Sequence, residues 1–306
     1  MRSVRSLLFV LFLACLTLAA VPAQAGKLKV SVSIIPQVYF VKAIGGDLVD
    51  VSAMVAPGAS PATYEPKPAQ MTSLAESDLY FSIGVPFESA WLERFRKAAP
   101  HTHFVAMQED IRRMAMGKHH HDGDEDHDHA EHGDMHHEHE HAMPDPHVWL
   151  APPLVRIMAE TTRDALIAAD PSNAAAYHAG YVSLCREINH VDSDILTIMD
   201  QAGAAGKTFF IFHPSFGYFA KAYGLHQQAV EAGGKAPGPR DLARLITLAK
   251  EKNVKVIFVS PQFSKRSAKT IADAIGGTVQ VADPLAADWP ANLRTIAKAF
   301  SQGASK

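Results

Sequence analysis

The sequence predicts an α/β protein with two lobes, each built on a mostly parallel sheet, and a long helix between the lobes. In both halves of the chain, short runs of β-branched and aromatic residues alternate with stretches of helical character. A single stretch of about 30 residues with helical spacing interrupts this alternation. Strands that alternate with helices are typical of βαβ units, and these units build parallel sheets.

The first lobe is predicted to cover residues 26–150. Its predicted strands are residues 29–35, 49–55, 79–83 and 103–106. Its predicted helices are residues 36–46, a segment that starts at Ala69, and residues 91–98. A loop rich in Pro and Gly, residues 57–68, separates the second strand from the helix that follows it.

Residues 151–205 form a predicted helical segment that includes the linking helix. A first helix covers residues 152–169 and ends at Asp170-Pro171. In residues 172–201, apolar side chains recur at three- and four-residue spacing, which indicates an amphipathic helix. At ~1.5 Å per residue it would be about 45 Å long, enough to reach from one domain to the other. The alternative is a long core helix within one domain.

The second lobe is predicted to cover residues 206–306. Its predicted strands are residues 208–212, 227–231, 254–260 and 278–282. Its predicted helices are residues 215–223, 239–252, 264–275 and 291–300. The two lobes are similar in size, although no convincing sequence repeat relates them.

Residues 1–25 are typical of a secretory signal peptide. Arg2 and Arg5 precede an apolar run, and Ala23-Gln24-Ala25 is a small-residue cleavage site. A membrane anchor is the alternative, but the apolar run is shorter than the roughly 20 residues that a membrane span needs. We therefore expect an exported, periplasmic protein.

Charge and cysteine content restrict the function further. Without residues 1–25, the chain has 27 Lys and Arg against 32 Asp and Glu, which is not the balance of a nucleic-acid-binding surface. Cys185 would be the only cysteine, which excludes an internal disulfide and zinc–thiolate coordination. Histidine and carboxylate groups remain as candidate metal ligands.

A tract at residues 118–142 consists mostly of His, Asp and Glu. Such a segment has almost nothing to bury, but imidazole groups suit zinc and similar metals. We interpret it as a loose metal collector beside a tighter site; the alternatives are a solvated linker or an expression tag. Residues 137–141 match the H-E-x-x-H metalloprotease pattern, but in a run of His and acids a chance match is expected.

Three other potential ligands stand next to predicted strand ends or loops, each beside a proline. His213 follows the strand at 208–212, Asp283 follows the strand at 278–282, and His147 lies in the loop Asp145-Pro146-His147. Ligands of open α/β sheets bind outside the carboxyl ends of the strands. Two His and a carboxylate suit zinc, or manganese if more oxygen ligands join. Taken singly, each His is more often a hydrogen-bonded loop residue.

Four motifs, in order, carry a resemblance that covers essentially the whole chain after residue 25. They are PGASPATYEP at 57–66, DPHVWL at 145–150, FHPSFGYF at 212–219 and ADPL at 282–285. Together they resemble the ZnuA-like (cluster A-I) solute-binding proteins of bacterial zinc and manganese ABC importers. The resemblance implies a rigid linking helix, a metal in the cleft between the lobes, and His147, His213 and Asp283 as ligands. The His-rich tract resembles that of zinc-preferring members.

One family ligand is absent from this chain. The family motif Pro-His-Thr-Tyr-Glu supplies a His where this chain has Ala62, whose methyl group cannot bind a metal. We expect Glu65, in the same loop, to turn in as the fourth ligand; a water or a His of the tract is the alternative.

The resemblance implies a monomeric periplasmic receptor that binds Zn²⁺, catalyses no reaction and delivers the ion to a membrane permease. A manganese receptor, a zinc-dependent hydrolase and a stand-alone zinc buffer are the alternatives. Trp91, Trp149 and Trp289 could line a pocket, although aromatic residues near loops more often serve packing.

Overall fold

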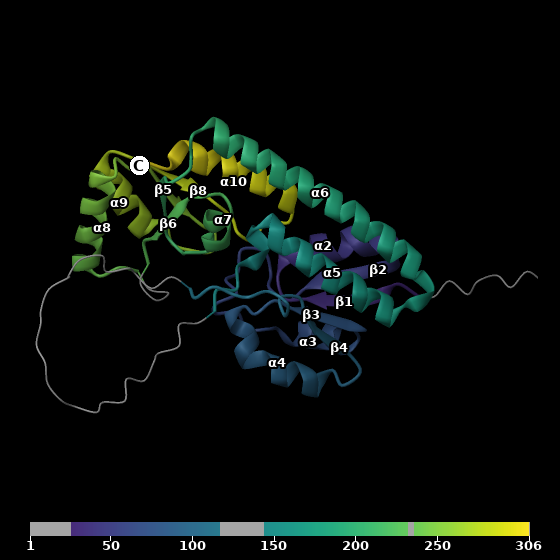
Figure 1. Ribbon diagram of the computed structural model, residues 1–306. Coiled ribbons are helices and arrows are strands. Elements are labelled where there is room, and N and C mark those ends of the chain that lie inside the picture. The colour runs from purple at the N-terminus through teal and green to yellow at the C-terminus, as the bar shows by residue number, and fades with distance from the viewer. Residues whose placement is uncertain (1–25, 117–143, 232–235, 306) are drawn as a thin grey trace, which may run out of the picture.

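The computed structural model describes residues 26–116, 144–231 and 236–305, and it confirms the two α/β lobes (Figure 1). The predicted signal peptide and the His/acid tract, with its H-E-x-x-H match, lie outside the described residues.

The N-terminal lobe contains a four-stranded parallel sheet with the strand order β2-β1-β3-β4. Its strands are β1 (Leu28–Val32), β2 (Val49–Ala53), β3 (Leu79–Ser82) and β4 (His103–Ala106). Its helices are α2 (Ile35–Gly45), the 3₁₀ turn η1 (Gly46–Leu48), α3 (Pro68–Ala75) and α4 (Pro86–Ala98). Helix α4 begins five residues before the predicted start at Trp91, because Pro86 suits the first helical turn, where its missing N–H costs nothing.

The C-terminal lobe repeats this arrangement, with the parallel strand order β6-β5-β7-β8. Its strands are β5 (Thr208–Ile211), β6 (His226–Ala229), β7 (Val256–Val259) and β8 (Thr278–Val281). Its helices are α7 (Gly217–Ala222), α8 (Pro239–Glu251), α9 (Arg266–Ile275) and α10 (Trp289–Gly303). In each lobe the first strand lies between the second and the third. The two lobes therefore share a topology, although no convincing sequence repeat relates them.

The predicted linking helix is α6 (Ala174–Gln201), which runs along both lobes (Figure 1). The 3₁₀ turn η2 (Val148–Leu150), helix α5 (Pro152–Ala169) and the 3₁₀ turn η3 (Pro171–Asn173) precede it. Helix α6 packs against α2 and α5 on the N-terminal side and against α10 on the C-terminal side. One straight element therefore fixes the spacing of the two lobes.

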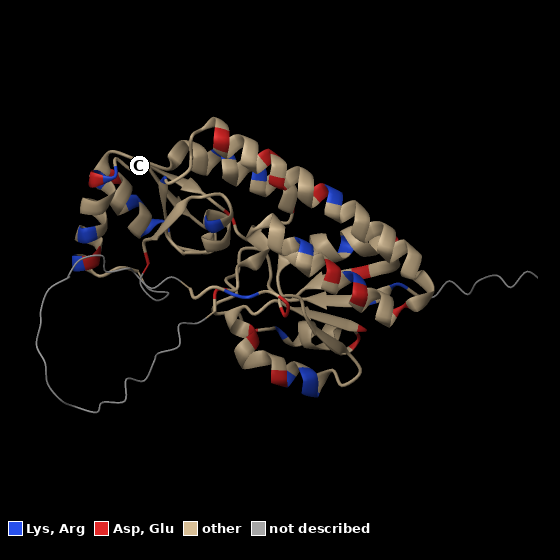
Figure 2. Cartoon of the chain, in the orientation of Figure 1, with Lys and Arg blue, Asp and Glu red and all other residues tan. Residues whose placement is uncertain are grey.

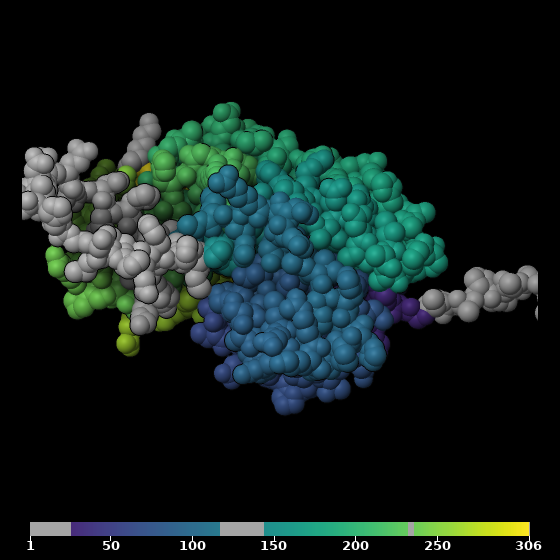
Figure 3. Space-filling model, turned by 60° about the horizontal axis from the view of Figure 1, so that its bottom comes forward, coloured from purple at the N-terminus to yellow at the C-terminus, as the bar shows by residue number. Residues whose placement is uncertain are grey.

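The hydrophobic core is continuous from one lobe to the other. One cluster of buried residues contains strands of the N-terminal sheet, the apolar face of α6, and one face of the C-terminal sheet. Along β5 and the residue after it, Phe209 and Ile211 join this cluster, whereas Phe210 and Phe212 join a second cluster under α8 and α9. This alternation follows from the two-residue period of a strand. Figure 3 shows the resulting contact between the blue N-terminal lobe and the teal helical segment.

Two of the three tryptophans hold the lobes together. Trp149 and Trp289 are each only 1% exposed, so they serve packing rather than line an open pocket. Trp289 of α10 stacks on Tyr39 of α2, with ring centroids 6.2 Å apart, and its indole N–H donates to the Trp149 carbonyl over 2.7 Å. The third, Trp91, packs against Phe95 within the N-terminal lobe.

Acidic and basic residues are interspersed along the helices (Figure 2). Of the helices in the described ranges, none combines the length and the apolar character that crossing a bilayer would require.

Candidate metal centre

His147 is held by a carboxylate two residues before it. Asp145 Oδ1 accepts hydrogen bonds from the backbone N–H of His147 over 3.0 Å and from its ring Nδ1 over 2.7 Å. Both residues are buried, at 3% exposed for Asp145 and 7% for His147. The 3₁₀ turn η2 starts directly after His147. The loop is therefore rigid, and Nε2 is the nitrogen of His147 left for a ligand.

His213 stands at the carboxyl end of β5 and is held in the same way. Its ring Nδ1 lies 2.8 Å from Oε1 of Glu231, which follows the neighbouring strand β6. The ring stacks on Phe263, with centroids 4.8 Å apart. The side chain of His213 is 15% exposed and that of Glu231 only 4%. As in His147, a carboxylate engages Nδ1 of His213, and Nε2 is the nitrogen left for a ligand.

The fold brings these two histidines together from opposite lobes. Their ring centroids lie 5.2 Å apart at an interplanar angle of 70°. Two imidazole nitrogens that share one first-row metal ion, at bonds of ~2.0–2.1 Å, require rings about this close. A carboxylate on Nδ1 of a metal-binding His fixes the tautomer and strengthens the other nitrogen as a donor.

Burial also keeps His147 in the form that binds a metal. Burial lowers the pKa of His147, and this effect outweighs the attraction of the Asp145 carboxylate, which raises the pKa. His147 is therefore neutral at pH 7, and its free nitrogen needs no deprotonation before it coordinates an ion.

Asp283 lies at the end of β8, on the same edge of the C-terminal sheet as His213. Its Oδ1 accepts hydrogen bonds from Gln262 Nε2 over 3.1 Å and from the backbone N–H of Leu285 over 2.9 Å. The next residue, Pro284, accepts a hydrogen bond of 2.7 Å from the Trp149 indole N–H. The loop of Asp283 is thus tied to the turn that follows His147.

The loop that carries Ala62 and Glu65 contributes less. Both residues are exposed. Within residues 26–116, 144–231 and 236–305, no three His, Cys, Asp or Glu side chains form a metal-binding cluster. The geometry therefore brings His147 and His213 together, while the metal-ligand roles of His147, His213, Asp283 and Glu65 all stay predictions.

Several buried polar atoms at the carboxyl edge of the C-terminal sheet lack hydrogen-bond partners among the described residues. They are Glu231 Oε2, Ser260 Oγ and Gln262 Oε1. Glu231 is the second residue after strand β6 and Ser260 the first after β7, and these strands lie on either side of β5, which leads to His213. A buried polar group without a partner is costly, so such a group at a ligand-binding edge indicates a missing polar partner.

Sequence reasoning missed two functional candidates, Asp145 and Glu231. Asp145 was visible in the motif at 145–150, but only as part of the loop that carries His147. Glu231 ends the predicted strand 227–231, so it shows the same strand-end signal as His213 and Asp283. The pairing order of the strands, which periodicity does not reveal, was needed to place it beside His213.

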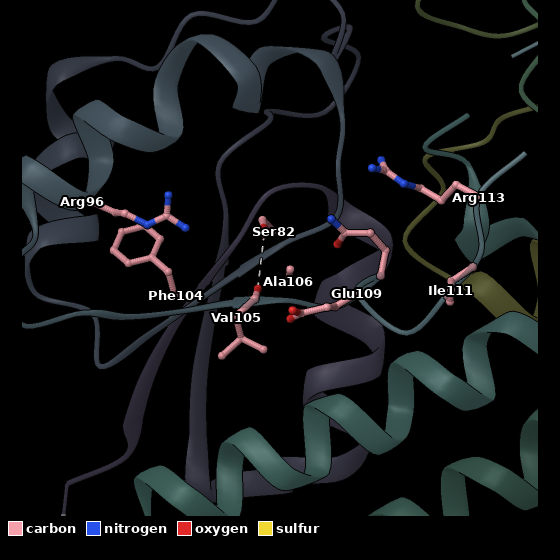
Figure 4. A pocket seen from close by; sticks show the side chains of 9 residues that line it. Ser82, Arg96, Phe104, Val105, Ala106, Glu109, Ile111 and Arg113 are labelled. Carbon is pink, nitrogen blue, oxygen red and sulfur yellow. Dashed lines mark hydrogen bonds between the residues drawn. The ribbon is translucent and has the colours of Figure 1, made fainter. Parts of the chain in front are cut away.

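A cavity of about 460 Å³ opens elsewhere, at the carboxyl ends of β3 and β4 in the N-terminal lobe (Figure 4). None of the predicted metal ligands reaches it, and its polar lining comes from Ser82, Arg96, Gln108, Glu109 and Arg113. It is separate from the pair of histidines.

Comparison with known proteins decides the family. The model of the ZnuA family, described as zinc-uptake complex component A, periplasmic, matches residues 30–303. The chain belongs to this family. The resemblance to metal-binding solute receptors is thereby confirmed, as is the two-lobed fold.

Several relatives of this ZnuA-family chain are zinc proteins by name. The high-affinity zinc uptake system protein ZnuA of Bacillus subtilis is 31% identical over 284 residues, which are 90% of this chain and 85% of that protein. Zinc-binding protein AdcA of Streptococcus pyogenes is 28% identical over 287 residues, 92% of this chain. These residues are only 55% of AdcA, so the chain spans about half the length of its AdcA relatives.

Solved structures agree on the fold. A crystal structure of ZnuA has a TM-score of 0.80 at 35% identity and covers 90% of this chain and 99% of its own. A ZnuA deletion mutant with zinc bound has a TM-score of 0.79, also at 35% identity, and covers 92% of this chain and 99% of its own. A manganese-bound periplasmic metal-binding protein from Candidatus Liberibacter asiaticus has a TM-score of 0.75 and covers 90% of this chain and 99% of its own. Its sequence identity is only 19%, so this match supports the fold alone.

Proposed function

We propose that this chain is an exported, non-enzymatic receptor that binds Zn²⁺ between its two lobes and delivers it to the permease of an ABC importer. The observation that carries the proposal is the pair His147 and His213, which come from different lobes with their rings 5.2 Å apart. In each His a buried carboxylate occupies Nδ1 and leaves Nε2 for the ion. The zinc uptake proteins among the relatives support the same assignment.

The donor atoms favour zinc over manganese. Neutral imidazole suits zinc, whereas manganese prefers carboxylate, carbonyl and water oxygens. Asp283, and Glu65 if its loop turns inward, would add oxygen donors and move the preference toward manganese. These possible oxygen donors keep a manganese receptor as the second candidate.

A competition titration of the metal-free full-length chain tests the proposal. A chromogenic chelator holds free zinc low, so that only the tightest site fills. We expect one tight zinc per chain, a loss of affinity of at least 100-fold in His147→Ala and in His213→Ala, and a smaller loss in Asp283→Ala. Unchanged affinity in both His variants would overturn the proposal, and tighter binding of manganese than of zinc would favour the second candidate.

The loop at 57–66 needs its own variants. If Glu65 is the fourth ligand, Glu65→Ala should weaken zinc binding about 10-fold or more, whereas unchanged affinity would exclude that role. Ala62→His restores the imidazole of the family motif and should strengthen binding. The exposed Glu76→Ala, in the same lobe, is the matched control.

The His/acid tract gives a second test of the receptor role. After deletion of residues 119–141, a receptor should keep one tight site, while a stand-alone buffer should lose nearly all its capacity. Zinc-loaded protein should leave esters and peptides intact, because a receptor needs no open coordination position for a reactive water.

A further inference from the structure

Glu231 has a buried carboxylate that lacks some of the hydrogen-bond and ion-pair partners that a buried charge needs. Its side chain is 4% exposed, and Oε1 lies 2.8 Å from His213 Nδ1. Oε2 has no hydrogen-bond partner among the described residues, and within the same ranges no Lys or Arg forms an ion pair with Glu231. An ionised carboxylate in such a place is unfavourable unless positive charge or further donors compensate.

The position of Glu231 shows which group could compensate for its buried negative charge. The backbone N–H of Glu231 donates to the Phe212 carbonyl over 3.0 Å, so the extension of β6 past its last paired residue places Glu231 directly beside His213. A cation on Nε2 of His213 would polarise the ring and strengthen the bond from Nδ1 to the carboxylate. The buried charge would then have a partner on the far side of the imidazole.

Glu231 does not have the geometry of a ligand to the same ion. Its carboxylate already faces Nδ1 of His213, whereas the ion would bind Nε2 on the other edge of the ring. Direct coordination would therefore require the carboxylate to leave its hydrogen bond.

We propose that Glu231 is a positioning residue of the metal centre, which holds His213 in the tautomer with the proton on Nδ1 and makes Nε2 a stronger donor. This inference rests on the proposed function and adds to it a specific requirement of this chain. With Ala62 in place of a ligand, the centre has fewer donors, so the orientation and strength of each remaining imidazole count for more. Asp145 does the same for His147 from within one loop, but Glu231 acts from a neighbouring strand, 18 residues away.

The tautomer of His213 in the metal-free full-length chain is the first readout. Nitrogen-15 NMR distinguishes a proton on Nδ1 from one on Nε2, and the signals that disappear in His213→Gln identify the residue. We expect the Nδ1–H form in the native chain and in Glu231→Gln, whose amide oxygen still accepts a hydrogen bond. In Glu231→Leu, which offers no acceptor, we expect a mixture of tautomers.

Zinc affinity, measured by chelator competition, is the second readout. We expect a loss of about 10- to 100-fold in Glu231→Leu and a smaller loss in Glu231→Gln, which keeps the hydrogen bond but removes the charge. The exposed Glu251→Gln, in the same lobe, should bind zinc like the native chain. Thermal unfolding of each metal-free variant shows whether it has folded.

The outcomes separate the two proposals. If native protein binds zinc tightly and His213→Ala does not, but Glu231→Leu and Glu231→Gln keep native affinity, the positioning role is overturned and the proposed function stands. An Nε2–H tautomer in the native metal-free chain would also overturn it. If native protein has no tight zinc site, the proposed function fails, whatever the tautomer of His213.

Discussion

At the scale of single residues, the centre consists of two histidines that are each held by a buried carboxylate. The Nδ1 bonds of His147 to Asp145 and of His213 to Glu231 are 2.7 and 2.8 Å long. Each histidine is thus held in one orientation, and under the proposed function this would lower the entropy cost of binding an ion.

The lowered pKa of His147 predicts how stability depends on pH. In the folded chain His147 titrates below the value of 6.5 that is usual for an exposed imidazole. As the pH falls through about 6.5, the unfolded chain takes up a proton at this position before the folded chain does. Protonation therefore favours unfolding, and His147 contributes a loss of stability of up to about 1.4 kcal/mol per pH unit until it is protonated in the folded state as well.

The measurement is the free energy of unfolding of the metal-free protein, with chelator present, between pH 7.5 and 5.5. We expect His147→Gln to lose less stability over this range than the native chain does. The matched control is His226→Gln, which replaces an exposed histidine at the start of β6. An equal or steeper loss in His147→Gln would contradict the prediction.

At the scale of elements, Gly180 permits α6 to cross α2 closely. A Cβ at this position would overlap the backbone carbonyl of Ile44, near the end of α2. Backbone atoms cannot turn aside as a flexible side chain can. A glycine inside a helix is usually destabilising, but Gly180 is the point at which α6 and α2 touch.

Gly180→Ala should therefore destabilise the protein by about 1–3 kcal/mol, the usual cost of forcing extra atoms into a packed interface. Helix propensity alone predicts the opposite, a gain of about 1 kcal/mol. Chemical denaturation measures the difference, and the neighbouring exposed Ala179→Gly reports propensity without the contact. A more stable Gly180→Ala variant would show that α2 and α6 separate easily.

At the scale of the whole molecule, aromatic side chains and hydrogen bonds join the lobes next to the centre. The indole N–H of Trp289 donates to the carbonyl of Trp149, and the indole N–H of Trp149 donates to the carbonyl of Pro284. These two hydrogen bonds link the loop of His147 to the loop of Asp283. The Tyr218 hydroxyl donates to the Asp145 carbonyl over 2.9 Å and accepts from the backbone N–H of Met114 over 2.9 Å. Together with the shared core, these bonds favour small loop movements over wide separation of the lobes.

Trp289→Phe tests this connection. Phenylalanine keeps most of the aromatic packing on Tyr39 but cannot donate to Trp149, and an unpaired buried carbonyl costs about 1–3 kcal/mol. We expect that loss in the free energy of unfolding, with faster hydrogen exchange in both α2 and residues 144–151. Trp91→Phe, within one lobe, should change neither segment. Equal effects of the two substitutions would contradict a role of Trp289 between the lobes.

The sequence by itself determined the elements, the parallel sheets, the long helix and the family, because hydrophobic periodicity and strand-end motifs are local properties. It also indicated His147 and His213, since each stands in a stiff loop beside a proline. Only the tertiary structure decided that their rings meet, that Glu231 supports His213, and that the two lobes share one topology and one core. These features depend on which strands pair and how α6 spaces the lobes, and such long-range contacts leave no periodic trace along the chain.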